Sequence, residues 1–109
     1  MLEQIHSEEQ FAELLSNQKK IMIMKHSSTC PISHAAYEEY EKFASESSKV
    51  PVYYLVVQDS RALSNYIADE YGIKHESPQA ILFADSKPVW NASHWKITSR
   101  ALKDAVSIN

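Results

Sequence analysis

Residues 20–33 read KIMIMKHSSTCPIS, and this stretch decides the fold. The apolar run from Lys20 to His26 is short and contains isoleucines, so it predicts a strand buried on both faces, as in a parallel sheet. Pro31 follows at a position typical of the first turn of a helix, where its missing N–H costs nothing. The strand therefore passes directly into a helix, and Cys30 takes the N-cap position of that helix.

The helix after Cys30 is predicted over Pro31–Ser47. Its apolar side chains share one face, which marks the side that packs on the sheet: Ile32, Ala35, Ala36, Tyr40, Phe43 and Ala44. Val52–Val57 is rich in β-branched and aromatic residues and predicts a second buried strand. A strand, a helix and a second strand in this order form a right-handed parallel crossover.

The remaining elements flank this unit. Ser7 and Gln10 form a capping box that starts a helix over Ser7–Ser16. A third helix begins after Asp59 or Ser60 and ends at Tyr71, because Gly72 suits the left-handed position that follows a helix. Two short strands, Ala80–Phe83 and Pro88–Ala92, are joined by a polar hairpin at 84–87. Thr98 or Ser99 caps a last helix with Ala101, Leu102, Ala105 and Val106 on one side.

The predicted order is α-β-α-β-α-β-β-α, in a single domain over residues 1–109. A mixed four-stranded sheet with helices on both faces accounts for all of these elements, so the fold class is α/β. The length of 109 residues is that of one ordinary domain, which can bury a real core without a disulfide.

Composition and charge exclude several functions. The net charge of −3 argues against nucleic-acid binding, which needs a basic surface. The longest apolar run, Ile21–Met24, is far too short to cross a membrane. The segment Met1–His6 has neither a basic region nor a long apolar region, so we expect no signal peptide and a cytoplasmic location. We also expect a monomer.

The chain contains one cysteine, so it can form neither an internal disulfide nor a cysteine-based zinc cage. His6, His34 and His75 have no metal-ligand spacing with partners, and we interpret them as surface residues. We therefore expect no metal site and no bound cofactor.

Cys30 is the candidate nucleophile. A thiolate is the reactive form of cysteine, and the unpaired N–H groups and dipole at a helix N-terminus stabilise it. Pro31 fixes the backbone at the helix entry, and Ser33 can offer its hydroxyl or its N–H to the sulfur. Cys-Pro-Ile-Ser is thus a redox Cys-x-x-Cys motif whose second thiol is replaced by an alcohol. Two alternatives make Cys30 a buried apolar residue or a mere helix cap.

The missing second thiol predicts the reaction. Cys30 can attack a mixed disulfide and take over its small-thiol cap, and a second molecule of that small thiol must then release the cap. The expected substrates are therefore proteins whose cysteines carry a low-molecular-weight thiol. Ser77-Pro78, placed between the third helix and the third strand, is a candidate cis peptide.

These residues together resemble the thioredoxin and glutaredoxin superfamily over essentially the whole chain. The resemblance rests on the Cys-Pro-x-Ser helix start, on Tyr71-Gly72-Ile73 and on Ser77-Pro78 before a strand. It implies a cis proline at Pro78 that packs against the active cysteine. It also implies that the residue before it, Ser77, offers backbone groups to an extended substrate.

Two segments are similar to those of a narrower family, the monothiol bacilliredoxins of the bacillithiol system. They are Lys25-His26-Ser27 with Thr29–Ser33, and Ser93-His94-Trp95-Lys96-Ile97-Thr98 near the end. The resemblance implies that the protein removes bacillithiol from client proteins, with bacillithiol as a thiol co-substrate and Cys30 as the residue that takes the cap. Because Ser33 replaces the resolving cysteine, general disulfide reduction is not expected.

Several residues are candidates for holding the substrate. His94 and Trp95 precede the last helix, whose N-terminus at Thr98 and Ser99 could receive a carboxylate of bacillithiol. The alternative is that Trp95 closes the core while His94 lies at the surface. Thr29 is expected to line the groove.

Lys25 and His26 lie four or five residues before the sulfur, where a positive charge would favour the thiolate. Strand alternation allows only one of the two to face the site, and the alternative places them at a solvated strand end.

Two other classes of function remain open. Monothiol glutaredoxins share an iron–sulfur cluster between two subunits, although Pro31-Ile32 replaces the Gly-Phe that usually follows their cysteine. A redox-inactive adaptor that binds extended peptides along Ser77-Pro78 is the other alternative.

Overall fold

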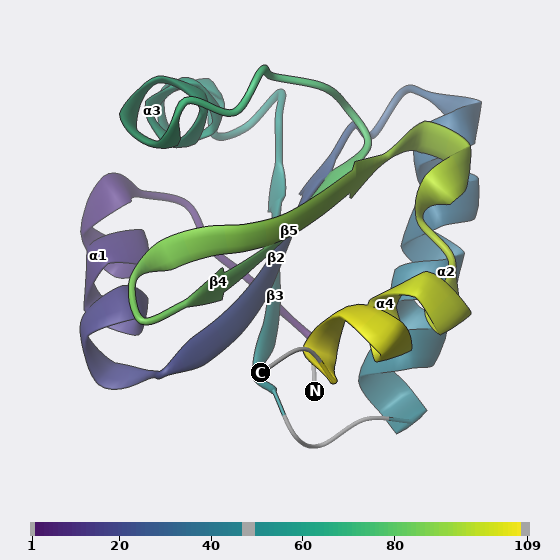
Figure 1. Cartoon of the computed structure of the whole chain (residues 1–109). Coiled ribbons are helices and arrows are strands. Elements are labelled where there is room, and N and C mark those ends of the chain that lie inside the picture. The colour runs from purple at the N-terminus through teal and green to yellow at the C-terminus, as the bar shows by residue number, and fades with distance from the viewer. Residues whose placement is uncertain (1, 47–49, 108–109) are drawn as a thin grey trace.

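The computed structural model describes residues 2–46 and 50–107, and its helices lie on both sides of a central sheet (Figure 1). The strands are β1 (Glu3–Gln4), β2 (Lys20–His26), β3 (Val52–Val56), β4 (Gln79–Ala84) and β5 (Lys87–Ser93). The helices are α1 (Glu8–Asn17), α2 (Pro31–Glu46), α3 (Arg61–Tyr71), the 3₁₀ turn η1 (His94–Lys96) and α4 (Ser99–Val106). No helix in the described residues is long and apolar enough to cross a bilayer.

The sheet is mixed, and its strands run in the order β1-β3-β2-β4-β5. β3 pairs in parallel with β1 and β2, whereas β4 is antiparallel to β2 and to β5. The predicted α/β class is confirmed, and so are the four predicted strands. β1 was not predicted, because a strand of two residues is too short to show a periodicity.

Alternating side chains of β2 supply two separate cores. Met22 and Met24 belong to a cluster with residues of α2 and α4. Ile21 and Ile23 belong to a second cluster, which contains Phe11 of α1 with Leu63 and Ile67 of α3. Figure 1 shows the matching layers, with α1 and α3 on one side of the sheet and α2 and α4 on the other. Every residue of β2 after Lys20 is buried, as predicted for a strand covered on both faces.

The caps of the helices largely follow the predictions. Ser7 caps α1 by accepting a hydrogen bond from the Gln10 N–H. The Gln10 side chain reaches back one residue further than expected and accepts from the N–H of His6. α3 ends at Tyr71, and the Gly72 that follows is left-handed with φ 64°. The predicted C-terminus of α2, Ser47, lies outside the described residues.

The hairpin between β4 and β5 has a tight turn. Asp85 and Ser86 both have positive φ, 52° and 65°, as a two-residue type I′ turn requires. The register then shifts between Leu82 and Phe83, because Leu82 pairs with Trp90 and Phe83 pairs with Pro88. This bulge leaves Val89 exposed on the edge strand β5.

One buried hydroxyl ties α2 to the sheet. The Tyr40 side chain is fully buried, and its hydroxyl oxygen lies 3.0 Å from the Met22 carbonyl oxygen and 2.6 Å from that of Tyr53. Met22 and Tyr53 belong to the two central parallel strands, so this contact fixes the position of α2 over β2 and β3. Burial raises the pKa of Tyr40 well above its usual value, which keeps the hydroxyl a donor.

We predict that Tyr40→Phe lowers the free energy of unfolding by about 1 kcal/mol, because it removes a buried donor from two carbonyl groups. Urea denaturation measures the change. Tyr66→Phe is the matched control, since the half-buried Tyr66 uses its ring against Phe11 and is expected to lose little. Equal losses in the two variants would contradict the prediction.

Candidate active site

Cys30 is half-buried and lies immediately before α2. Its N–H donates to the Ser27 carbonyl at 3.4 Å, and its own carbonyl accepts from the His34 N–H at 3.0 Å. The second bond is the first of the helix, so Cys30 occupies the N-cap position that the sequence predicts. A half-buried thiol at this position does not fit the alternative of an apolar residue packed inside the core.

Ser33 is fully buried, and its hydroxyl is already engaged. The hydroxyl oxygen accepts from the Ser27 N–H at 2.8 Å and lies 2.8 Å from His26 Nδ1. No hydrogen bond among the described residues reaches the sulfur of Cys30. The hydroxyl of Ser33 therefore braces the loop that carries Cys30, and the prediction that it is available to the sulfur is wrong.

His26 completes this brace on the α2 side of the sheet. Its ring is 8 % exposed, stacks on Tyr37 with centroids 4.7 Å apart and meets His34 edge-on at 5.2 Å. Burial, together with the nearby His34, lowers the pKa of His26 below its usual 6.5. The imidazole is thus neutral at neutral pH and holds Ser33 through a hydrogen bond between uncharged groups.

Gln58 was not among the predicted site residues, although it holds the same loop. Its Nε2 donates to Ser27 Oγ at 2.8 Å and to Thr29 Oγ1 at 3.2 Å. Its Oε1 accepts from the Ser28 N–H at 3.2 Å. The sequence carried a signal for this contact, because parallel neighbours β2 and β3 end at the same edge of the sheet. Thr29 itself is exposed beside Cys30.

Lys25 lies on the opposite face of the sheet from His26. It is fully buried, and its Nζ donates to the Ser64 carbonyl at 2.9 Å and lies 3.2 Å from His75 Nδ1. Burial lowers the pKa of Lys25 to about 8, and the charge of Asp69 partly offsets this effect. The alternative of a solvated strand end is wrong for both Lys25 and His26. Their alternation brings His26, and not Lys25, to the Cys30 side.

Ser77 and Pro78 lie at the edge of the sheet from which the Cys30 loop leaves. The peptide bond between them is cis. Pro78 precedes Gln79, which pairs with Lys25 of β2. Among the described residues no hydrogen bond uses the backbone N–H or carbonyl of Ser77, and its buried Oγ has no partner. This residue therefore has free pairing groups next to the strand that leads to Cys30.

His94 and Trp95 form part of η1, which packs against α2. The His94 N–H donates to the Pro78 carbonyl at 3.0 Å, and His94 has a left-handed φ of 57°. Trp95 is 71 % exposed, so the alternative that it closes the core is wrong. The structure thus joins His94 directly to Pro78 and presents the neighbouring indole to solvent.

A carboxylate from the chain itself occupies the N-terminus of α4. Thr98 caps the helix by accepting from the Ala101 N–H, and the Ser99 N–H donates to Glu39 Oε1 of α2 at 2.8 Å. From the sequence, this terminus was predicted to receive a carboxylate from the ligand. The structure instead fills it with a carboxylate from the chain, which fixes α4 to α2.

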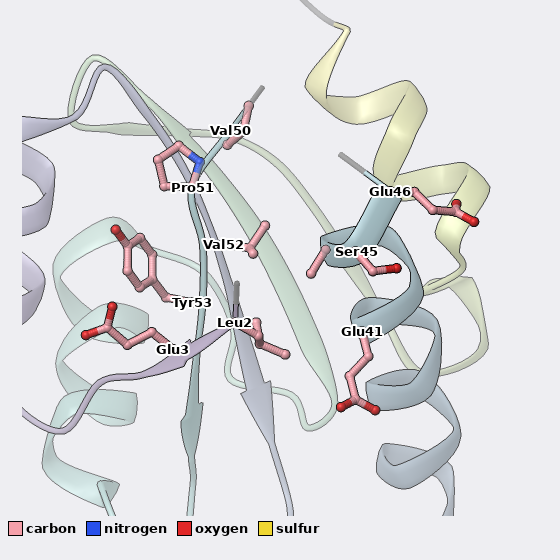
Figure 2. A pocket seen from close by; sticks show the side chains of 10 residues that line it. Leu2, Glu3, Glu41, Ser45, Glu46, Val50, Pro51, Val52 and Tyr53 are labelled. Carbon is pink, nitrogen blue, oxygen red and sulfur yellow. The ribbon is translucent and has the colours of Figure 1, made fainter. Parts of the chain in front are cut away.

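An open pocket lies at the other end of α2, far from Cys30. Figure 2 shows that it opens between the last turns of α2 and the start of β3. Its described lining consists of apolar, acidic and hydroxyl side chains and contains neither cysteine nor histidine: Leu2, Glu3, Glu41, Ala44, Ser45, Glu46, Val50, Pro51, Val52 and Tyr53. It takes no part in the arrangement around the thiol. No cluster of three or more histidine, cysteine or acidic residues in the described ranges could hold a metal ion.

The arrangement around Cys30 supports nucleophilic thiol chemistry. Cys30 is half-buried, lies at the positive end of a helix of 16 residues and is the single cysteine of the chain. Its loop is braced by Ser33, His26 and Gln58.

Comparisons with solved structures agree with this chemistry. A thioredoxin-fold chain that carries an oxidoreductase assignment is 41 % identical, with 96 % of this chain and 93 % of that chain covered and a TM-score of 0.90. A thioredoxin mutant from Halobacterium salinarum is 20 % identical, with coverages of 97 % and 88 % and a TM-score of 0.79. Malassezia sympodialis thioredoxin is 21 % identical, with coverages of 98 % and 89 % and a TM-score of 0.77. The last two likenesses show the thioredoxin fold, as the sequence resemblance implied.

The family comparison is more specific than the fold. The family described as monothiol bacilliredoxin BrxC matches residues 3–102, which include Cys30, the cis Pro78 and η1. The match supports a role in thiol redox chemistry and confirms the family to which the two quoted segments were similar. The chain belongs to the BrxC family of monothiol bacilliredoxins.

Proposed function

We propose that the protein is a monothiol oxidoreductase that removes bacillithiol from the cysteines of client proteins. The observation that carries the proposal is the single half-buried thiol of Cys30 at the start of α2, with a buried serine where a resolving cysteine would stand. Membership of the BrxC family supports bacillithiol as the small thiol. The reaction needs no bound cofactor and belongs to the cytoplasm, where thiols are kept reduced.

The exchange proceeds in two steps. The Cys30 thiolate attacks the bacillithiol sulfur of the mixed disulfide, a new sulfur–sulfur bond forms and the client cysteine leaves as a thiolate. A second bacillithiol thiolate then attacks the capped Cys30, and bacillithiol disulfide leaves. Overall, the client cysteine is reduced to a thiol at the expense of the second bacillithiol, whose sulfur is oxidised as it joins the transferred bacillithiol in the disulfide. Ser33 takes no covalent part in either step.

The residues around Cys30 suit a client that arrives as an extended segment. The free N–H and carbonyl of Ser77 supply backbone groups for an added strand next to the cis Pro78. The exposed indole of Trp95 supplies an apolar face that can stack on the sugar of bacillithiol. His94 and Thr29 lie at the exposed rim of the same edge.

We predict that incubation with a bacillithiol-capped protein transfers the cap to Cys30, which intact-mass measurement detects on the purified protein. Cys30→Ser must lose the transfer completely, because an alcohol does not exchange with disulfides at neutral pH. Clients that remain capped with the wild-type protein would contradict the proposed reaction. Equal processing of glutathione-capped protein would contradict the choice of small thiol and leave the exchange chemistry in place.

Introducing a second cysteine at position 33 tests the monothiol mechanism. In Ser33→Cys the new sulfur lies one helical turn after Cys30, within reach of the mixed disulfide. We predict that the capped form no longer accumulates and that the protein loses two hydrogens as an internal disulfide forms. Ser33→Ala, the matched control without a second cysteine, should still accumulate the cap, although more slowly because the loop loses the Ser33 hydroxyl. Accumulation of the cap in Ser33→Cys would contradict the prediction.

The neutral state of His26 makes stability dependent on pH. Because burial lowers its pKa in the folded protein, the unfolded state binds more protons below about pH 6.5, and stability falls as the pH falls through this range. We predict that His26→Gln reduces this loss, measured as the free energy of unfolding at pH values between about 7.5 and 5.5. The same substitution at the exposed His6 serves as the control. An unchanged pH dependence in His26→Gln would contradict the prediction.

A further inference from the structure

A fully buried ammonium group lies under the loop that leads to the cis proline. Lysine is almost never fully buried unless its charge is paired, yet the two hydrogen-bonding partners of Lys25 Nζ among the described residues are a carbonyl oxygen and an imidazole nitrogen. Those partners belong to Ser64 of α3 and to His75 of the loop between α3 and β4. The thiol chemistry leaves this group unused, because it faces away from Cys30.

We propose that Lys25 is a positioning residue that holds the loop of residues 72–78 so that the Ser77 backbone is ready to pair with a client segment. The inference rests on the proposed function, since it assigns a role in client recognition at the same edge of the sheet. Lys25 acts through His75 and touches neither the client nor the sulfur.

The contact of Lys25 with His75 anchors the loop, and a residue of the neighbouring strand β4 adds a second contact to this anchor. Gln79 of β4 pairs with Lys25 of β2 across the sheet, and it too is buried. Its Nε2 donates to the Lys74 carbonyl at 3.1 Å. Two cross-strand neighbours on the α3 side therefore hold two consecutive loop residues, Lys74 and His75.

The anchor stops just short of the pairing residue. The loop starts at the left-handed Gly72, and the side chains of Gln79 and Lys25 hold it at residues 74 and 75. A hydrogen bond from Ser93 lowers the pKa of the next carboxyl along the loop, that of Glu76. Ser77 comes next, with its backbone groups unused within the described part of the chain. An anchored loop keeps these groups in place before the client arrives, which reduces the entropy lost on binding.

The charge states of the partners fit this role. His75 Nδ1 lies 3.2 Å from both Lys25 Nζ and Ser64 Oγ, so its lone pair faces two donors. Partial burial of the ring, with the charges of Lys25 and Arg61, lowers the pKa of His75, which keeps the ring neutral and Nδ1 an acceptor at neutral pH. A protonated ring would place two positive groups against each other.

The test is Lys25→Met, which keeps a long apolar stem and removes the donor. We expect the concentration of capped client protein at half-maximal transfer to rise at least fivefold. The maximal transfer rate and the rate of Cys30 alkylation by iodoacetamide should stay within about twofold of wild type, because the thiol and its loop lie on the other face. Amide hydrogen exchange of residues 74–77 should also accelerate.

Lys74→Met is the matched control, because it removes a charge from the same loop while its exposed side chain has no part in the anchor. His75→Ala, an exposed position that should not impair folding, is expected to raise the half-maximal concentration and to add little to Lys25→Met in the double variant. An unchanged half-maximal concentration in Lys25→Met or His75→Ala, or an equal rise in Lys74→Met, overturns the inference. Wild-type protein that takes no cap from the client defeats the proposed function instead.

Discussion

The burial of β2 on both faces is the constraint on which the rest of the structure depends. This strand pairs on both sides, with β3 and β4, and its alternate side chains supply the two cores that hold α2 and α4 on one face and α1 and α3 on the other. A shift of its register by one residue would exchange every side chain between the faces. The same alternation continues to the end of the strand, where it separates His26 from Lys25.

Because of this separation, the two loops at the functional edge of the sheet are supported by different residues. On the α2 face, His26 and Ser33 stabilise the loop that carries the thiol, together with Gln58 from the end of β3. On the α3 face, Lys25 and Gln79 hold the loop that leads to Pro78. The nucleophile and the client-pairing residue are thus supported by different polar clusters on opposite sides of a single strand. A substitution in one cluster can change one function while the other continues.

Periodicity and helix caps were enough to predict the α/β class, the four longer strands and the position of Cys30 before α2. Local patterns could not reveal β1, whose two residues are recognisable only by their pairing with β3. They also could not show that Lys25 is buried, because its partners Ser64 and His75 are distant in sequence and meet it only in the folded chain. The occupied N-terminus of α4 was missed for the same reason, since Glu39 belongs to another helix.

The two outer strands of the sheet, β5 and β1, are built in a way that disfavours aggregation between molecules. Open strand edges act as templates for aggregation, and proteins blunt them with prolines, bulges and very short strands. β5 carries Pro88 and a bulge opposite Leu82 and Phe83, while β1 on the other side offers only two residues. Neither margin presents a long, flat row of pairing groups to another molecule. The fold can therefore expose backbone at Ser77 for recognition without inviting fibril-like stacking along its flanks.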